Sequence, residues 1–131
     1  MSSWKSADNH LIAKVVPLLV MFTLFATTAF AELKVVGSGS ETRFDPAEIP
    51  VNMRQSYQVL TSRCNSCHSV ERLVDAVRNG IAPITGQPFD AESAGGLVRK
   101  VAGKPDSNIN EVEVKEILDV LNFLFTKQAA K

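Results

Sequence analysis

The stretch that decides the fold and the chemistry of this chain is Cys64-Asn65-Ser66-Cys67-His68. In a helix the two thiols stand one turn apart, and the imidazole follows the second thiol directly. Two thiols at this spacing can each add to a vinyl group of one porphyrin, and the adjacent imidazole is then placed to bind the iron. The run is therefore typical of the attachment of one covalent haem c, with His68 as the proximal iron ligand.

Three other interpretations of the same run compete with haem attachment. A thioredoxin-like redox pair requires a βαβ context, and the sequence has no such pattern. A zinc site usually has four ligands, whereas the chain after residue 31 contains two cysteines and one histidine. A disulfide between Cys64 and Cys67 stays open as an alternative in an oxidising compartment. Haem attachment is favoured because export, small size and a helical pattern coincide with the motif.

The N-terminal segment predicts export. Residues 15–30 carry no charge, and the run ends in Ala29-Phe30-Ala31, the small-x-small pattern that precedes signal-peptidase cleavage. We expect residues 1–31 to be a signal peptide and the protein to be periplasmic. The alternative is an uncleaved anchor, because about 16 apolar or small residues approach the length of a membrane span. Contact with a membrane is expected only in that case.

Outward from the motif, the sequence predicts an all-α domain of about four short helices wrapped around one haem, over residues 51–131. An Asn52–Gln55 capping box begins the first helix, which ends in the motif. Asn79-Gly80 ends a second helix. Asp90 begins a third helix that runs to about Val101. The strongest capping box, Asn110–Glu113, begins the last helix, whose apolar stripe is Val114, Ile117, Leu118, Leu121, Leu124 and Phe125.

The remaining segment and the composition limit the other possibilities. Residues 32–50 contain Gly37-Ser38-Gly39-Ser40 and two X-Pro pairs, so we expect an irregular N-terminal linker. The 131 residues carry 14 basic and 14 acidic side chains, which gives no electrostatic reason to expect nucleic acid as a partner. A domain this small often needs a cofactor to complete its core.

Beyond the motif, the chain resembles small monohaem cytochromes c of the bacterial class I type. The resemblance lies in residues 64–72 (CNSCHSVER), in residues 98–109 (VRKVAGKPDSNI) and in the final helix from Glu111 to about Thr126, and it covers roughly residues 52–127. It implies a cytochrome c fold. It also implies electron transfer between redox partner proteins, by an electron carrier rather than an enzyme.

The chain departs from this family at the sixth iron ligand. The family supplies a methionine downstream of the motif, but this sequence has no methionine after Met53, and the matching position is Val101. Met53, Lys100 and Lys104 are weak candidates for the ligand. Asn108 and Asn110 are weaker still, because turn and cap roles explain them. An open or water-occupied position is the leading expectation, and a ligand from a partner is a further alternative.

Two functions therefore follow as expectations. The first is periplasmic electron transfer, as a soluble shuttle or as the haem subunit of an oxidoreductase. The alternative is a five-coordinate haem protein that binds or senses a small ligand such as CO or NO. A third, weaker possibility is that the haem serves mainly as core. The near-zero net charge predicts short-range docking to redox partners with weak dependence on salt.

Overall fold

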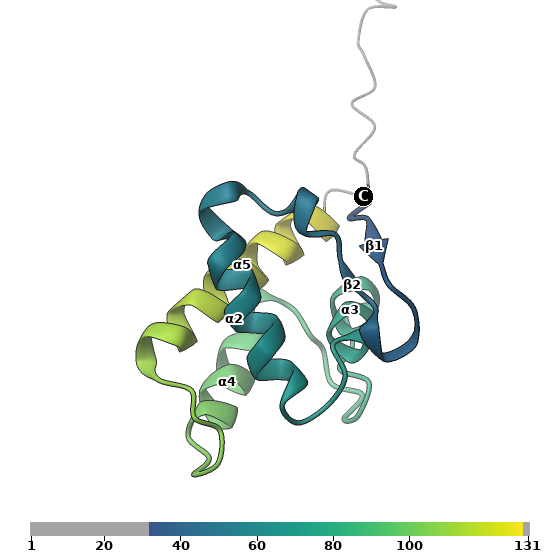
Figure 1. Ribbon diagram of the computed structural model, residues 1–131. Helices are drawn as coiled ribbons and strands as arrows, with labels where there is room; N and C mark the ends of the chain where they lie inside the picture. Colours follow the sequence, from purple (N-terminus) through teal and green to yellow (C-terminus); the bar gives the residue numbers. More distant parts are fainter. Residues whose placement is uncertain (1–31, 130–131) are drawn as a thin grey trace, which may run out of the picture.

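The computed structural model of this protein describes residues 32–129 as a mostly helical domain with a small two-stranded sheet (Figure 1). The predicted signal peptide, residues 1–31, lies outside the described residues. In chain order the elements are β1 (Val35–Val36), the 3-10 turn η1 (Gly39–Glu41), β2 (Arg43–Phe44), the 3-10 turns η2 (Pro46–Glu48) and η3 (Val51–Met53), and the helices α2 (Arg54–Asn65), α3 (Glu71–Asn79), α4 (Ala91–Ala102) and α5 (Glu111–Ala129).

The segment 32–50 is part of the packed domain, which corrects the expectation of an irregular linker. β1 pairs with β2 in an antiparallel hairpin, with Val35 opposite Phe44. Phe44 is completely buried and belongs to the hydrophobic core. The glycines that suggested a linker are needed for the turn of the hairpin. Gly37 has a φ of 87°, and a Cβ there would collide with the carbonyl oxygen of Glu41.

The predicted capping box at Asn52 and Gln55 is wrong. Helix α2 begins at Arg54, and its N-cap residue, Met53, makes no side-chain capping hydrogen bond. The 3-10 turn η3 precedes the helix, and the backbone N–H of Met53 donates to the carbonyl of Pro50 at 2.8 Å. The chain therefore enters α2 through a 3-10 turn instead of the side-chain cap expected at Asn52.

The predicted end of α3 and the predicted starts of α4 and α5 are confirmed, whereas α5 runs to Ala129, beyond the expected end at about Thr126. Gly80 ends α3 in the left-handed conformation, with a φ of 68°. Asp90 caps α4 in a capping box with Ser93. At the start of α5, Asn110 Oδ1 accepts from the N–H of Glu113, and Glu113 Oε2 accepts from the N–H of Asn110, both at 3.0 Å.

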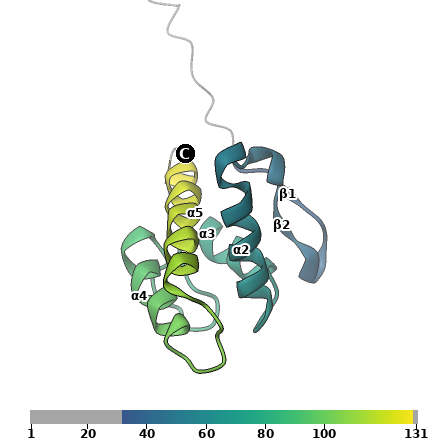
Figure 2. The same ribbon diagram turned by 60° about the vertical axis from the view of Figure 1, so that its left-hand side comes forward.

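Helix α5 packs most extensively against α2 and next against α4 (Figure 2). Because α5 packs against both of these helices, its buried face is wider than a single apolar stripe. Val114, Ile117, Leu121 and Leu124 are buried as predicted, whereas Leu118 and Phe125 are half-buried. Val120 was not predicted, yet it is completely buried. Within residues 32–129, no helix has the length and apolar character needed to cross a bilayer.

Candidate functional site: a helical turn that carries two thiols and an imidazole

The Cys-x-x-Cys-His run occupies the C-terminal end of α2 and the turn that follows. Cys64 lies in the last turn of the helix. The backbone N–H groups of Cys67 and His68 both donate to the carbonyl oxygen of Cys64, at 3.5 Å and 3.4 Å. The chain therefore stays coiled through the motif, although the regular helix ends at Asn65.

The hydrogen bonds to the Cys64 carbonyl keep Cys64, Cys67 and His68 within one turn of the chain. In an ideal helix, where successive residues are rotated by about 100°, Cys67 would stand about 60° to one side of Cys64 and His68 about 40° to the other. Within the described part of the chain, no three His, Cys, Asp or Glu side chains form a group that could hold a metal ion. The two thiols and the imidazole therefore share a turn without forming such a group. A zinc site built from protein ligands alone therefore gains no support.

The two thiols lie in different environments. Cys64 is half-buried and packs against the hydrophobic core, whereas Cys67 is exposed, and both cysteines are free. Burial, and to a smaller extent the nearby Cys67, raise the pKa of the Cys64 thiol to about 11. Cys64 is therefore protonated at neutral pH. A thioredoxin-like redox pair needs a βαβ context, whereas residues 32–129 form helices and one short antiparallel hairpin.

The imidazole of His68 is half-buried, and its Nδ1 atom lies 3.3 Å from the carbonyl oxygen of Ser69. With the proton assigned to Nδ1, the ring donates to this carbonyl and the lone pair of Nε2 is available for a metal. This contact is local, because Ser69 directly follows His68 in the chain.

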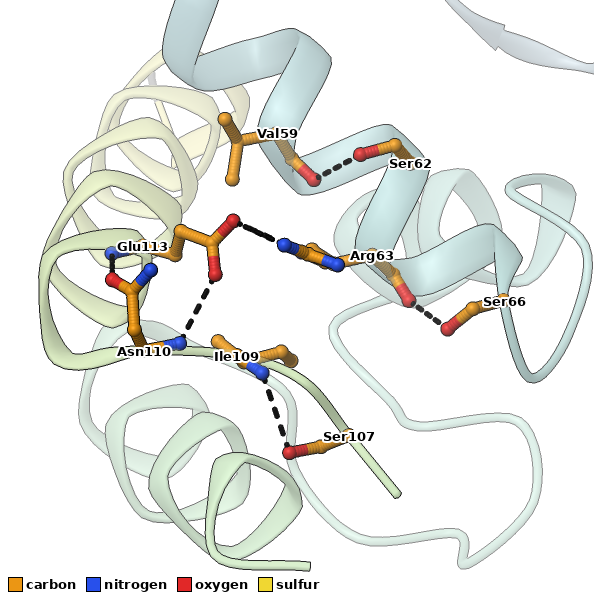
Figure 3. A network of polar contacts seen from close by, with 8 residues as sticks. All are labelled: Val59, Ser62, Arg63, Ser66, Ser107, Ile109, Asn110 and Glu113. Atoms are coloured by element: carbon orange, nitrogen blue, oxygen red, sulfur yellow. Dashed lines mark hydrogen bonds and ion pairs between the residues drawn. The ribbon is translucent and has the colours of Figure 1, made fainter. Parts of the chain in front are cut away.

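A polar network joins the motif to the start of α5, as Figure 3 shows. Arg63, the residue before Cys64, donates from Nε and Nη2 to Glu113 Oε1, at 3.0 Å and 2.5 Å. Glu113 also forms the capping box with Asn110. The hydrogen bonds from Arg63 and from the Asn110 N–H lower the pKa of Glu113. The capping box was predicted from the sequence, whereas the contact with Arg63 was not, because the two residues are 50 positions apart.

The segment 103–110 connects α4 to α5 and borders an open depression. The depression is lined by Ala102, Lys104, Pro105, Ser107, Asn108, Ile109 and Asn110. Ser107 Oγ donates to the carbonyl of Ala102 at 2.8 Å, and Asn108 has a φ of 51°. Figures 1 and 2 place this segment, the C-terminal end of α2 and the segment 81–88 at the same end of the molecule, opposite the C-terminus of α5.

The candidates for a sixth iron ligand lie in different places. Met53 stands at the start of α2 and packs against the core. The helical rise places it about 16 Å along the axis from Cys64, which argues against a role at the same iron. Lys100 is exposed on α4, and Lys104 is exposed and lines the depression. Val101, between them, is half-buried.

Apolar side chains are exposed at the same end of the molecule. Ile81 and Ile84, in the segment after α3, are 51% and 70% exposed. Among the described residues, none of the buried side chains is charged, and Tyr57, the one that carries a hydroxyl, donates it to the carbonyl of Phe44 at 2.8 Å.

Comparison with protein-family models, with curated proteins and with solved structures found no match to this chain. The interpretation of the site therefore rests on the residues and their geometry.

Proposed function

We propose that this protein transfers electrons through one covalently attached haem c. The observation that carries the proposal is the single turn of the chain that holds Cys64, Cys67 and His68. Two thiols and an imidazole in this order match the two vinyl groups and the axial iron position of one porphyrin. The mostly helical fold is compatible with a cytochrome c-like domain, which belongs to the same proposal.

The attachment chemistry is redox-neutral. Each thiol would add across one vinyl group: sulfur would bond to one carbon, the thiol hydrogen would pass to the neighbouring carbon, and the double bond would become single. Cys64 starts as a neutral thiol, because burial raises its pKa to about 11. Since the thiolate is the reactive form, we expect attachment at Cys64 to need assistance from dedicated machinery.

The roles of the chain's own residues follow from their positions. A c-type haem held at this turn supplies a one-electron iron couple. His68 would hold the iron through Nε2, because its Nδ1 lies within hydrogen-bond distance of the Ser69 carbonyl. Ile81 and Ile84 provide apolar surface that a macrocycle would cover, which removes that area from water. Exposed Cys67 marks the edge that is open to redox partners.

The proposal is tested by spectroscopy on the protein made in a host that attaches c-type haem. We expect haem absorption that survives denaturation, and reversible reduction and oxidation with electron exchange to a redox partner. Replacing both Cys64 and Cys67 by Ala should abolish the covalently retained absorption. Ser66→Ala, between the cysteines and exposed, is the matched control and should keep it. No retained haem in the unmodified protein, or a haem that does not cycle, would show that the proposal is wrong.

A second candidate function is the binding of a small ligand at a five-coordinate haem. Its support is the position of Met53, which lies about 16 Å along α2 from the motif and is the last methionine of the sequence. Low-spin spectra unchanged by CO in both oxidation states would exclude this function. High-spin bands that shift on addition of CO would favour it over electron transfer.

A further inference from the structure

The side chain of Glu113 connects the two parts of the polar network at the motif (Figure 3). Its two carboxylate oxygens bind different segments. Oε1 accepts both hydrogen bonds from Arg63 on α2, and Oε2 accepts from the backbone N–H of Asn110, where the segment 103–110 ends. One carboxylate therefore ties the attachment helix to the start of α5 and to the end of this segment.

The Arg63–Glu113 ion pair is better shielded from water than an ordinary surface pair. The side chains of Glu113 and Arg63 are 15% and 34% exposed. By contrast, the pair Lys115–Asp119 on the same helix is 77% and 51% exposed. Shielding and two donors from one guanidinium make the first pair the stronger and more directional one, because exposed pairs contribute little.

The position of Arg63 in the chain gives this pair a link to the candidate site. Arg63 directly precedes Cys64, so the guanidinium held by Glu113 belongs to the same helical turn as the first thiol. A rotation of this turn about the axis of α2 would displace the sulfur of Cys64 and anything bonded to it. Glu113 opposes that rotation, since its carboxylate is fixed by Asn110 at the start of α5.

We propose that Glu113 is a positioning residue that, through Arg63, fixes the turn carrying Cys64 against the segment 103–110 and so sets the orientation of the attached haem. This inference rests on the proposed haem function. It adds a role for two residues outside the Cys-x-x-Cys-His motif. Glu113 acts through Arg63 and is not expected to touch the haem.

The test compares Glu113→Gln with Asp119→Asn in the haem-loaded protein. A glutamine keeps an acceptor for the Asn110 N–H but removes the charge that holds Arg63. We expect Glu113→Gln to carry covalent haem, to change the Soret circular dichroism and to shift the reduction potential. In haem-loaded Glu113→Gln, hydrogen exchange of the backbone amides at positions 110 and 113 should be roughly tenfold faster, because the start of α5 is no longer held by Arg63. Asp119→Asn, which breaks the exposed pair on the same helix, should leave all three measurements unchanged.

Arg63 supplies the second arm of the experiment. Arg63→Gln should reproduce the shifts of Glu113→Gln, and the double variant should add nothing further, because both changes remove the same contact. Arg63→Lys keeps the charge but loses the two-donor geometry, so it should give a smaller shift. If Glu113→Gln does not fold, the two Arg63 variants decide the question alone.

The outcomes separate this inference from the function on which it rests. Haem in the unmodified protein, with dichroism and potential unchanged in the Glu113 and Arg63 variants, would overturn the positioning role and leave the haem function standing. An unmodified protein without covalent haem would overturn both. If Asp119→Asn shows the same shifts as the Glu113 and Arg63 variants, their cause is a general loss of surface charge. That result would likewise overturn the positioning role.

Discussion

The hairpin region and the motif end of this molecule differ in how far their apolar side chains are buried. The hairpin region, in which β2 and Ile49 pack with α2, α3 and α5, buries Phe44, Ile49 and Leu60 to 1% exposure or less. The motif end, formed by residues 64–70, 81–88 and 103–110, leaves Ile81 and Ile84 more than half exposed. The first region completes its core with its own side chains, whereas the second presents apolar surface that an attached macrocycle would cover.

The largest effect is expected from a cavity in the hairpin region. Phe44 has no exposed surface, so Phe44→Ala should destabilise the protein by about 3–5 kcal/mol. The loss includes the hydrophobic transfer of the ring and the cavity that remains. Chemical denaturation measures it as a lower midpoint with an unchanged slope. A loss below about 1 kcal/mol would show that the hairpin packs loosely and would remove the contrast between the two regions.

A smaller effect is expected from the hydroxyl of Tyr57, which donates to the carbonyl of Phe44 at 2.8 Å. Burial raises the pKa of Tyr57 to about 12. A raised folded-state pKa favours the neutral phenol, so this contribution to stability is fully present below pH 10 and is lost between pH 10 and about pH 12. The loss should amount to roughly 2 kcal/mol.

Tyr57→Phe provides the control for this pH dependence. It should cost about 1–2 kcal/mol at neutral pH, because the Phe44 carbonyl loses its donor. Above pH 10 the variant should lose less stability than the unmodified protein, and thermal unfolding between pH 7 and pH 11 measures the difference. Parallel stability curves for the two proteins would contradict the assignment of the alkaline loss to Tyr57.

Local signals in the sequence predicted most of the helical architecture. Asp90, Asn110 and Gly80 each define a helix end through contacts within four residues, so their roles follow from short-range rules. The hairpin was missed because its strands have two residues each, too few for a periodic pattern. The start of α2 was misplaced because a 3-10 turn, which has no clear sequence signature, took the place of the expected side-chain cap.

The sequence likewise predicted some features of the candidate site and missed others. The five-residue motif predicted which side chains share one turn, because their relation depends only on helical geometry. The contact between Arg63 and Glu113 depends on how α2 crosses α5, and no pattern within either helix predicts it. The Ser69 carbonyl near the His68 ring was likewise missed, because it depends on the local path of the chain after the motif.

The smallest expected effect tests whether the haem covers the motif end in the haem-loaded protein. Ile84 and Val51 are both largely exposed, at 70% and 79%, but Val51 lies in η3 before the start of α2, whereas Ile84 lies at the motif end. An exposed apolar residue changed to Ser usually alters stability by less than about 0.5 kcal/mol. Val51→Ser should follow this rule. If the haem covers Ile84, Ile84→Ser should instead cost about 1 kcal/mol, since covered apolar area is lost. That corresponds to a melting temperature about 4–8 °C lower, whereas equal melting temperatures would place the haem away from this segment.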